Sequence, residues 1–106
     1  MWKIDNGKET GSTGAEYADA LSWGCAELDK KSILLTETGG AQSLKYKLLG
    51  YYTEDGQADE LVAETTLAAS GSARFQYHKQ YHTLVLQVKN GDGAADYQVD
   101  YEGVGA

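Results

Sequence analysis

The chain has 106 residues, of which 16 are acidic and nine basic, giving a formal net charge of −7. This excess of acid argues against nucleic acid or an anionic membrane as the main partner, because both need a basic footprint. A single cysteine excludes an internal disulfide and a thiolate zinc cluster, and no apolar run approaches the roughly 20 residues that span a bilayer.

Residues 1–14 differ from the rest of the chain. They hold three glycines and alternating charges, with Trp2 and Ile4 as the clearly apolar residues and no apolar stretch of the kind a signal peptide needs. Two interpretations stay open, a disordered tail or an arm that becomes ordered against a neighbouring subunit with Trp2 and Ile4 as anchors. We therefore predict a flexible N-terminal arm over residues 1–14 and a single domain over residues 15–106.

Beyond this segment, apolar and polar residues alternate with period two, which is typical of strands that bury one face. In chain order, strands are predicted over residues 22–28, 31–38, 43–49, 61–67, 72–78, 82–89 and 97–102. The one stretch with helical spacing, residues 15–28, is interrupted by Gly24. Ile33 and Leu35 are predicted to point inward, and Leu86 is predicted to lie on a strand in the centre of a sheet.

Turn signals separate the predicted strands. Gly39-Gly40 and Ser70-Gly71 are tight-turn sequences, residues 54–60 form an acidic loop, and Asn90-Gly91-Asp92-Gly93 is the strongest hairpin signal in the chain. This pattern predicts an all-β fold, an antiparallel β-sandwich of about six to eight strands with little helix. Jelly-roll, immunoglobulin-like and small-barrel topologies share the pattern, and the sequence does not choose among them.

Histidine and cysteine offer few signs of catalysis. His78 and His82 lie four residues apart between strands with no third ligand nearby, so we expect solvent-facing histidines and no metal site. Cys25 is flanked by Glu27 and Asp29, which oppose a thiolate, so it is predicted to be a small buried residue. We expect no enzymatic activity and no cofactor.

Acidic residues near the predicted turns are candidate calcium ligands. Asp92 and Asp96, with Asn90, resemble calcium ligands in type, but their spacing matches no EF-hand loop. A solvated charged surface is the better interpretation.

The eight tyrosines are the strongest sign of an interaction surface, because tyrosine buries apolar area while keeping a polar end and is enriched at interfaces. Tyr51 and Tyr52 are adjacent, so in a strand they point to opposite faces. We predict an interface that includes Trp2, Ile4, Tyr51 and Tyr52. The alternative is a carbohydrate-binding module in which exposed Trp23, Tyr51 or Tyr52 stacks on sugar rings.

Four segments form a familiar layout along residues 20–103: Thr38-Gly39-Gly40, Leu44 to Tyr51, Glu64 to Ala68, and Tyr81 to Lys89. The layout resembles small β-sandwich proteins encoded among the virion structural genes of tailed bacteriophages, including capsid decoration proteins. The resemblance implies a structural role without catalytic residues and a coat surface, the major capsid protein or another virion protein, as partner. We accordingly expect a homo-oligomeric virion protein, made in the host cytoplasm, that binds neither nucleic acid nor membranes.

Overall fold

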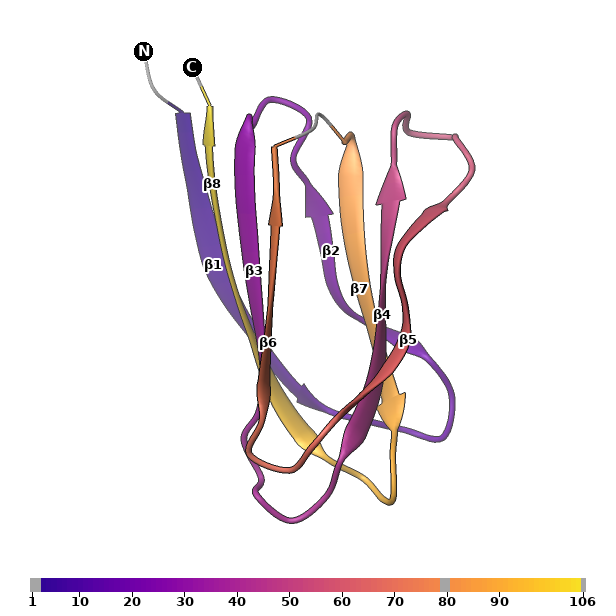
Figure 1. Cartoon of the computed structure of the whole chain (residues 1–106). Helices are drawn as coiled ribbons and strands as arrows, with labels where there is room; N and C mark the ends of the chain where they lie inside the picture. Colours follow the sequence, from indigo (N-terminus) through magenta and orange to yellow (C-terminus); the bar gives the residue numbers. More distant parts are fainter. Residues whose placement is uncertain (1–2, 79–80, 106) are drawn as a thin grey trace.

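Eight β-strands make up the structure, a computed structural model that describes residues 3–78 and 81–105 (Figure 1). In chain order the strands are β1 (Lys3–Ser12), β2 (Ala18–Gly24), β3 (Lys30–Glu37), β4 (Leu44–Tyr51), β5 (Asp59–Leu67), β6 (Ser72–Tyr77), β7 (Thr83–Asn90) and β8 (Asp96–Gly105). The described residues contain no helix with the length and apolar character needed to cross a membrane.

The strands form two antiparallel sheets of four. The first sheet has the order β1-β8-β3-β6 and the second has the order β2-β7-β4-β5. Among strands that follow one another in the chain, only β4 and β5 are also neighbours in a sheet, so the other connections cross from one sheet to the other (Figure 1). This is the connectivity of a jelly roll. The predicted β-sandwich is confirmed, and pairing selects one of the three topologies that the sequence leaves open.

The inner faces of the two sheets meet in a core of branched apolar side chains. Ile33 and Leu35 are 1% and 0% exposed, which confirms their predicted inward direction. Leu86 is 0% exposed and lies on β7 in the middle of the second sheet, opposite Leu21 on one side and Leu48 on the other. Each fully buried leucine of this kind stabilises the fold by roughly 1.5–3 kcal/mol relative to an exposed one.

The strand predicted over residues 22–28 lies earlier in the chain, as β2. It ends at Gly24, and the chain then turns, with the amide of Leu28 donating to the carbonyl of Cys25 at 3.1 Å. Trp23, Cys25 and Leu28 are all buried although they belong to a strand end and a turn. Burial in this turn extends the apolar pattern past the strand, which explains the misplaced boundary.

The hairpin predicted at residues 90–93 is wrong. This loop joins β7 to β8, which lie in different sheets. It is held by a contact to another crossing loop, since the carboxylate of Asp92 accepts a hydrogen bond from the amide of Ser43 at 2.7 Å. A glycine-rich turn signal marks where a strand stops, but it does not specify which strand the chain pairs with next.

Residues 3–12 also differ from the predicted arm, because they form β1 and pair with β8 along its whole length. The glycines that suggested flexibility lie under tyrosine rings of β8. A Cβ atom on Gly7 would be 2.6 Å from Cζ of Tyr101, and one on Gly11 would be 2.8 Å from Cζ of Tyr97. β1 is therefore held by backbone pairing with β8 and by the tyrosine rings of β8. It does not need alternating apolar residues of its own.

Candidate interaction surface

The two ends of the sandwich, which Figure 1 shows at the top and at the bottom, differ in the side chains that they carry. β1 begins and β8 finishes at one end, which we call the aromatic end. Its aromatic residues lie at the finish of β2 and in or beside the connections that follow β4 and β6: Trp23, Tyr52, Tyr77 and Tyr81. The opposite end holds the connections that follow β1, β3, β5 and β7, with most of the turn glycines and three bonded carboxylates, Glu37, Asp92 and Asp96; we call it the glycine end.

Glu37 is the organising residue of the glycine end. It is 2% exposed, and its carboxylate accepts hydrogen bonds from the amides of Gly39 at 2.9 Å, Gly40 at 2.8 Å and Ser70 at 2.8 Å. These amides, Ser70 and Gly40 foremost, hold the pKa of Glu37 below its usual value. Gly40 and Ser70 adopt φ angles of 81° and 61°, the left-handed region, so the carboxylate stabilises two turns at once.

The acidic loop residues also bond to neighbouring loops. Asp92 accepts from the Ser43 amide at 2.7 Å, which lowers the pKa of Asp92, and Asp96 accepts from the hydroxyl of Ser12 at 2.6 Å. Within residues 3–78 and 81–105, no group of three or more His, Cys, Asp or Glu side chains is arranged to hold a metal ion. The carboxylates at this end fasten the crossing loops together.

A stack of tyrosines forms the aromatic end. Tyr81 is 3% exposed and packs against Tyr52, with ring centroids 4.9 Å apart, and against Tyr77 at 6.1 Å in an edge arrangement. Gly50 makes room for it, since a Cβ there would be 2.9 Å from the Tyr81 ring. Burial, with the neighbouring Tyr52 hydroxyl, raises the pKa of Tyr81 to about 12. Tyr52 covers this stack from outside and remains 56% exposed.

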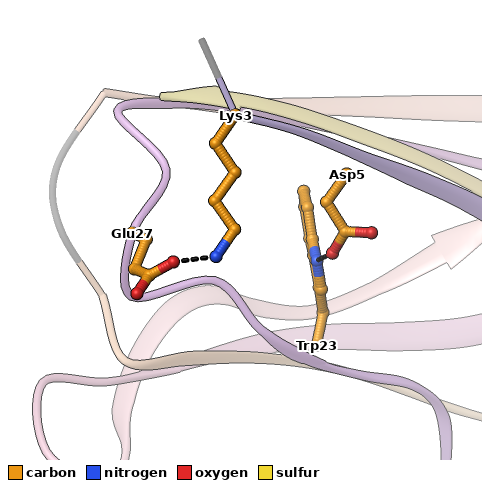
Figure 2. A network of polar contacts seen from close by, with 4 residues as sticks. All are labelled: Lys3, Asp5, Trp23 and Glu27. Atoms are coloured by element: carbon orange, nitrogen blue, oxygen red, sulfur yellow. Dashed lines mark hydrogen bonds and ion pairs between the residues drawn. The ribbon is translucent and has the colours of Figure 1, made fainter. Parts of the chain in front are cut away.

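Trp23 belongs to the core at this end. It is 4% exposed, its ring lies 4.9 Å from that of Tyr101, and its Nε1 donates to Oδ2 of Asp5 on β1 at 2.9 Å. Figure 2 shows this bond beside the ion pair between Lys3 and Glu27, which ties β1 to the loop after β2. The carbohydrate-binding alternative therefore loses one of its three candidate stacking residues, because no sugar ring can reach the buried indole face of Trp23.

The predicted interface residues do not form one patch. Ile4 is 63% exposed on β1, at one edge of the first sheet, whereas Tyr52 follows β4 of the second sheet. β1 begins and β4 finishes at the aromatic end (Figure 1), so both residues belong to that end but to strands of different sheets. Tyr51 is half-buried, and Trp2 lies outside the described residues. Tyr52 is thus the exposed member of the tyrosine stack, and Ile4 belongs to a separate surface along β1.

One surface feature escaped the sequence analysis. Tyr17, from the loop after β1, lies over the ammonium groups of Lys47 and Lys89, 4.4 and 4.8 Å from its ring centroid, and its hydroxyl donates to Glu64 at 2.6 Å. The cluster covers β4, β5 and β7 on one face of the second sheet. No local sequence signal predicts it, because its members come from four separate segments.

Cys25, His78 and His82 also lie at the aromatic end. Cys25 is 1% exposed, its thiol donates to the Tyr81 carbonyl at 3.5 Å, and burial raises its pKa, which confirms the predicted buried role. His78 is exposed at the end of β6 as predicted. His82 is half-buried instead, with Nδ1 2.7 Å from the hydroxyl of Thr83.

The outer face of the first sheet carries a shallow groove of about 460 Å³. Its lining includes Lys30, Ser32, Gln76, Asp100 and Glu102. One amide, one hydroxyl and charges of both signs are mixed there, so the groove favours no single ligand charge.

No protein-family model matches the sequence, and no curated protein is similar to it. Among solved structures, the chain is similar to the SPBc2 prophage-derived protein YomS, with a TM-score of 0.68 and 8% identity over 98% of this chain and 95% of that one. It is also similar to the decameric BFDV capsid protein, with a TM-score of 0.60 and 6% identity over 98% and 96% of the two chains. It is similar as well to a protein of the disulfide-linked pili of Bacillus endospore appendages, with a TM-score of 0.58 and 15% identity over 100% of this chain and 90% of that one. At these identities the likeness shows a common fold alone.

Proposed function

We propose that this chain is a non-enzymatic structural protein of a virus particle, a capsid decoration protein that binds coat subunits through its aromatic end. Tyr52 carries the proposal, because its ring is 56% exposed yet braced against buried Tyr81 at 4.9 Å. Tyrosine is enriched at protein interfaces, and a ring that is already held in place loses little conformational entropy on binding.

The fold is consistent with a role in a virus particle. The chain is similar over nearly its full length to a prophage-derived protein and to a viral capsid protein, and its sequence layout resembles phage decoration proteins. A protein that binds only the assembled coat stabilises it by mass action, because its binding energy is lost when the particle opens. A small domain with its loops fastened at one end and an exposed aromatic at the other suits such a role.

Particles produced by cells that carry this gene test the proposal. We expect the chain to co-sediment with them in a fixed ratio to the coat protein and to appear on the outer surface by electron cryomicroscopy. Tyr52→Ser should weaken attachment by about tenfold or more, as expected for an aromatic anchor. The matched control Thr66→Ser changes an exposed residue of β5 and should leave attachment intact.

Two results would count against the proposal in different ways. A wild-type chain that stays in the soluble fraction while particles band separately would reject the virion role. Full attachment of the Tyr52→Ser protein would reject the aromatic end as the contact.

A further inference from the structure

Four strands form the edges of the two sheets, and β1 is the one best suited to pair with another chain. Edge strands are normally blunted by bulges, by short length or by charged side chains, and β1 has only the last of these, with charges of both signs. β2 has a register shift between Asp19 and Leu21, β5 is shifted twice along β4, and β6 has six residues. β1 runs for ten residues opposite β8 with no shift in register.

The free backbone groups of β1 belong to its even-numbered residues. The amide of Thr38 donates to the carbonyl of Asp96 at 3.0 Å, so even-numbered residues of β8 face β3. The amide of Thr13 donates to the carbonyl of Ala95 at 2.8 Å, so odd-numbered residues face the first segment of the chain. Because odd-numbered residues of β1 lie opposite odd-numbered residues of β8, the even-numbered ones, Ile4 to Ser12, direct their N–H and C=O groups away from the sheet.

The charges on β1 suit a second copy of the same strand. The chain as a whole carries −7, yet β1 is balanced, with Lys3 and Lys8 against Asp5 and Glu9. By contrast, the edge strand β5 carries Asp59, Glu60 and Glu64 and no base, so two copies would repel each other there.

We propose that β1 pairs antiparallel with β1 of a second copy, with Asn6 opposite Asn6 of the partner subunit, to give one continuous eight-stranded sheet across a two-fold axis. Lys3 then lies opposite Glu9 of the partner subunit, and the reciprocal pair forms as well. These odd-numbered positions are non-hydrogen-bonded pairs of the new ladder, at which opposed side chains approach most closely. Ile4, 63% exposed in the single chain, is covered by the methylene stem of the partner's Lys8.

Charge selects this register over its neighbours. Centring the pair on Asp5 sets that carboxylate opposite itself, and centring it on Gly7 sets Asp5 opposite the partner's Glu9. Centring it on Lys8 opposes two ammonium groups. Like charges directly opposite each other destabilise a strand pair. Centring the pair on Ile4 or Thr10 opposes no like charges but pairs only residues 3–5 or 8–12 of β1. The Asn6-centred register, which spans residues 3–9, is therefore favoured. The pairing needs no coat protein and stands independently of the virion role.

Sedimentation equilibrium on the full chain, without particles, measures the dimer. Asn6→Pro removes an amide that points away from β8, a position at which an edge strand tolerates proline, and it should raise the dimer dissociation constant about tenfold or more. Thr10→Pro is the matched control, since the amide of exposed Thr10 also points away from β8 but Thr10 lies beyond residues 3–9. Its dissociation constant should stay near that of wild type, and circular dichroism should report the same β content for both variants.

Charge reversal tests the register itself. Lys3→Glu should weaken the dimer by opposing the partner's Glu9, and Glu9→Lys should do so by opposing the partner's Lys3. The double variant should bind more tightly than either single variant, although it still lacks the ion pair between Lys3 and Glu27 of the same chain. A wild-type chain that stays monomeric at about 1 mM would overturn the inference. So would a Lys3→Glu/Glu9→Lys protein no tighter than the single variants, or an Asn6→Pro protein that dimerises normally. Tyr52→Ser should leave the dimer unchanged, which separates this contact from coat attachment.

Discussion

The carboxylate of Glu37 accepts a hydrogen bond from the backbone amide of Ser70 at 2.8 Å across 33 residues of sequence. Ser70 has a φ angle of 61°, which is uncommon for a residue with a side chain. The same carboxylate binds the amides of Gly39 and Gly40. One buried charge therefore fixes the connections that follow β3 and β5, and each of these carries the chain from one sheet to the other.

Stability should depend on pH through Glu37. Its pKa is lowered in the folded chain, chiefly by the amides of Ser70 and Gly40. A lowered pKa means that the stabilisation is present above the unfolded-state value and is lost as pH falls through the folded-state value. The difference in unfolding free energy between wild type and Glu37→Gln should be greatest near neutral pH and should shrink as pH falls below 4.5, the ordinary glutamate value.

Urea unfolding at a series of pH values measures this difference. The control is Glu16→Gln, which removes an exposed carboxylate from the loop after β1. A gap between wild type and Glu37→Gln that stays constant down to about pH 3 would show that the charge of Glu37 is not what holds the two turns.

Gly7 should not tolerate alanine. A Cβ there would be 2.6 Å from Cζ of Tyr101, and the ring cannot retreat freely because its other neighbour is Trp23, 4.9 Å away between centroids. Gly7→Ala should destabilise the fold by roughly 1–3 kcal/mol, the usual result of overpacking. Gly14→Ala is the control, because no atom lies within 4 Å of a Cβ at that position. Equal melting temperatures for the two variants would mean that Tyr101 does not pack on β1.

Asp5 should contribute to stability through Trp23. Asp5→Ala leaves the buried indole N–H without its acceptor, at a cost of roughly 1–3 kcal/mol. Thr10→Ala, an exposed change on the same strand, should have little effect. Chemical denaturation of both variants provides the measurement.

Truncation extends this test to the strand as a whole. A flexible arm predicts that deletion of residues 1–5 leaves the melting temperature unchanged, whereas β1 predicts a clear decrease because ladder bonds and the Asp5 contact are lost. An unchanged melting temperature would favour the arm.

Leu86 should be among the costliest leucines to truncate. It is 0% exposed and packed between β2 and β4, so Leu86→Ala should destabilise by roughly 2–5 kcal/mol. Leu34→Ala on β3 is the matched control, since Leu34 is half-buried opposite Arg74 and Asp100 and should cost less. If both variants unfolded at the same urea concentration, β7 would not be the centre of the core.

The fold class, the places of most strands and the direction of core residues such as Ile33, Leu35 and Leu86 could be predicted from the sequence alone. The sequence also identified Cys25 as buried. These properties follow from short-range alternation, because a strand with one face in the core must repeat apolar residues every second position. Alternation records the face that a residue buries, but it does not record the strand beside it.

The jelly-roll order, the strand formed by residues 3–12 and the burial of Trp23 depend on contacts between segments far apart in the chain. The local sequence around Gly7 and Gly11 suggests flexibility. In the structure, the absence of a side chain at each position leaves room for the rings of Tyr101 and Tyr97, which lie far along the chain on β8. The sequence around Glu37 suggests an exposed acid, yet Glu37 is buried and its carboxylate accepts hydrogen bonds from three amides of two loops. In each case the deciding partner is remote in sequence, so no local pattern could contain it.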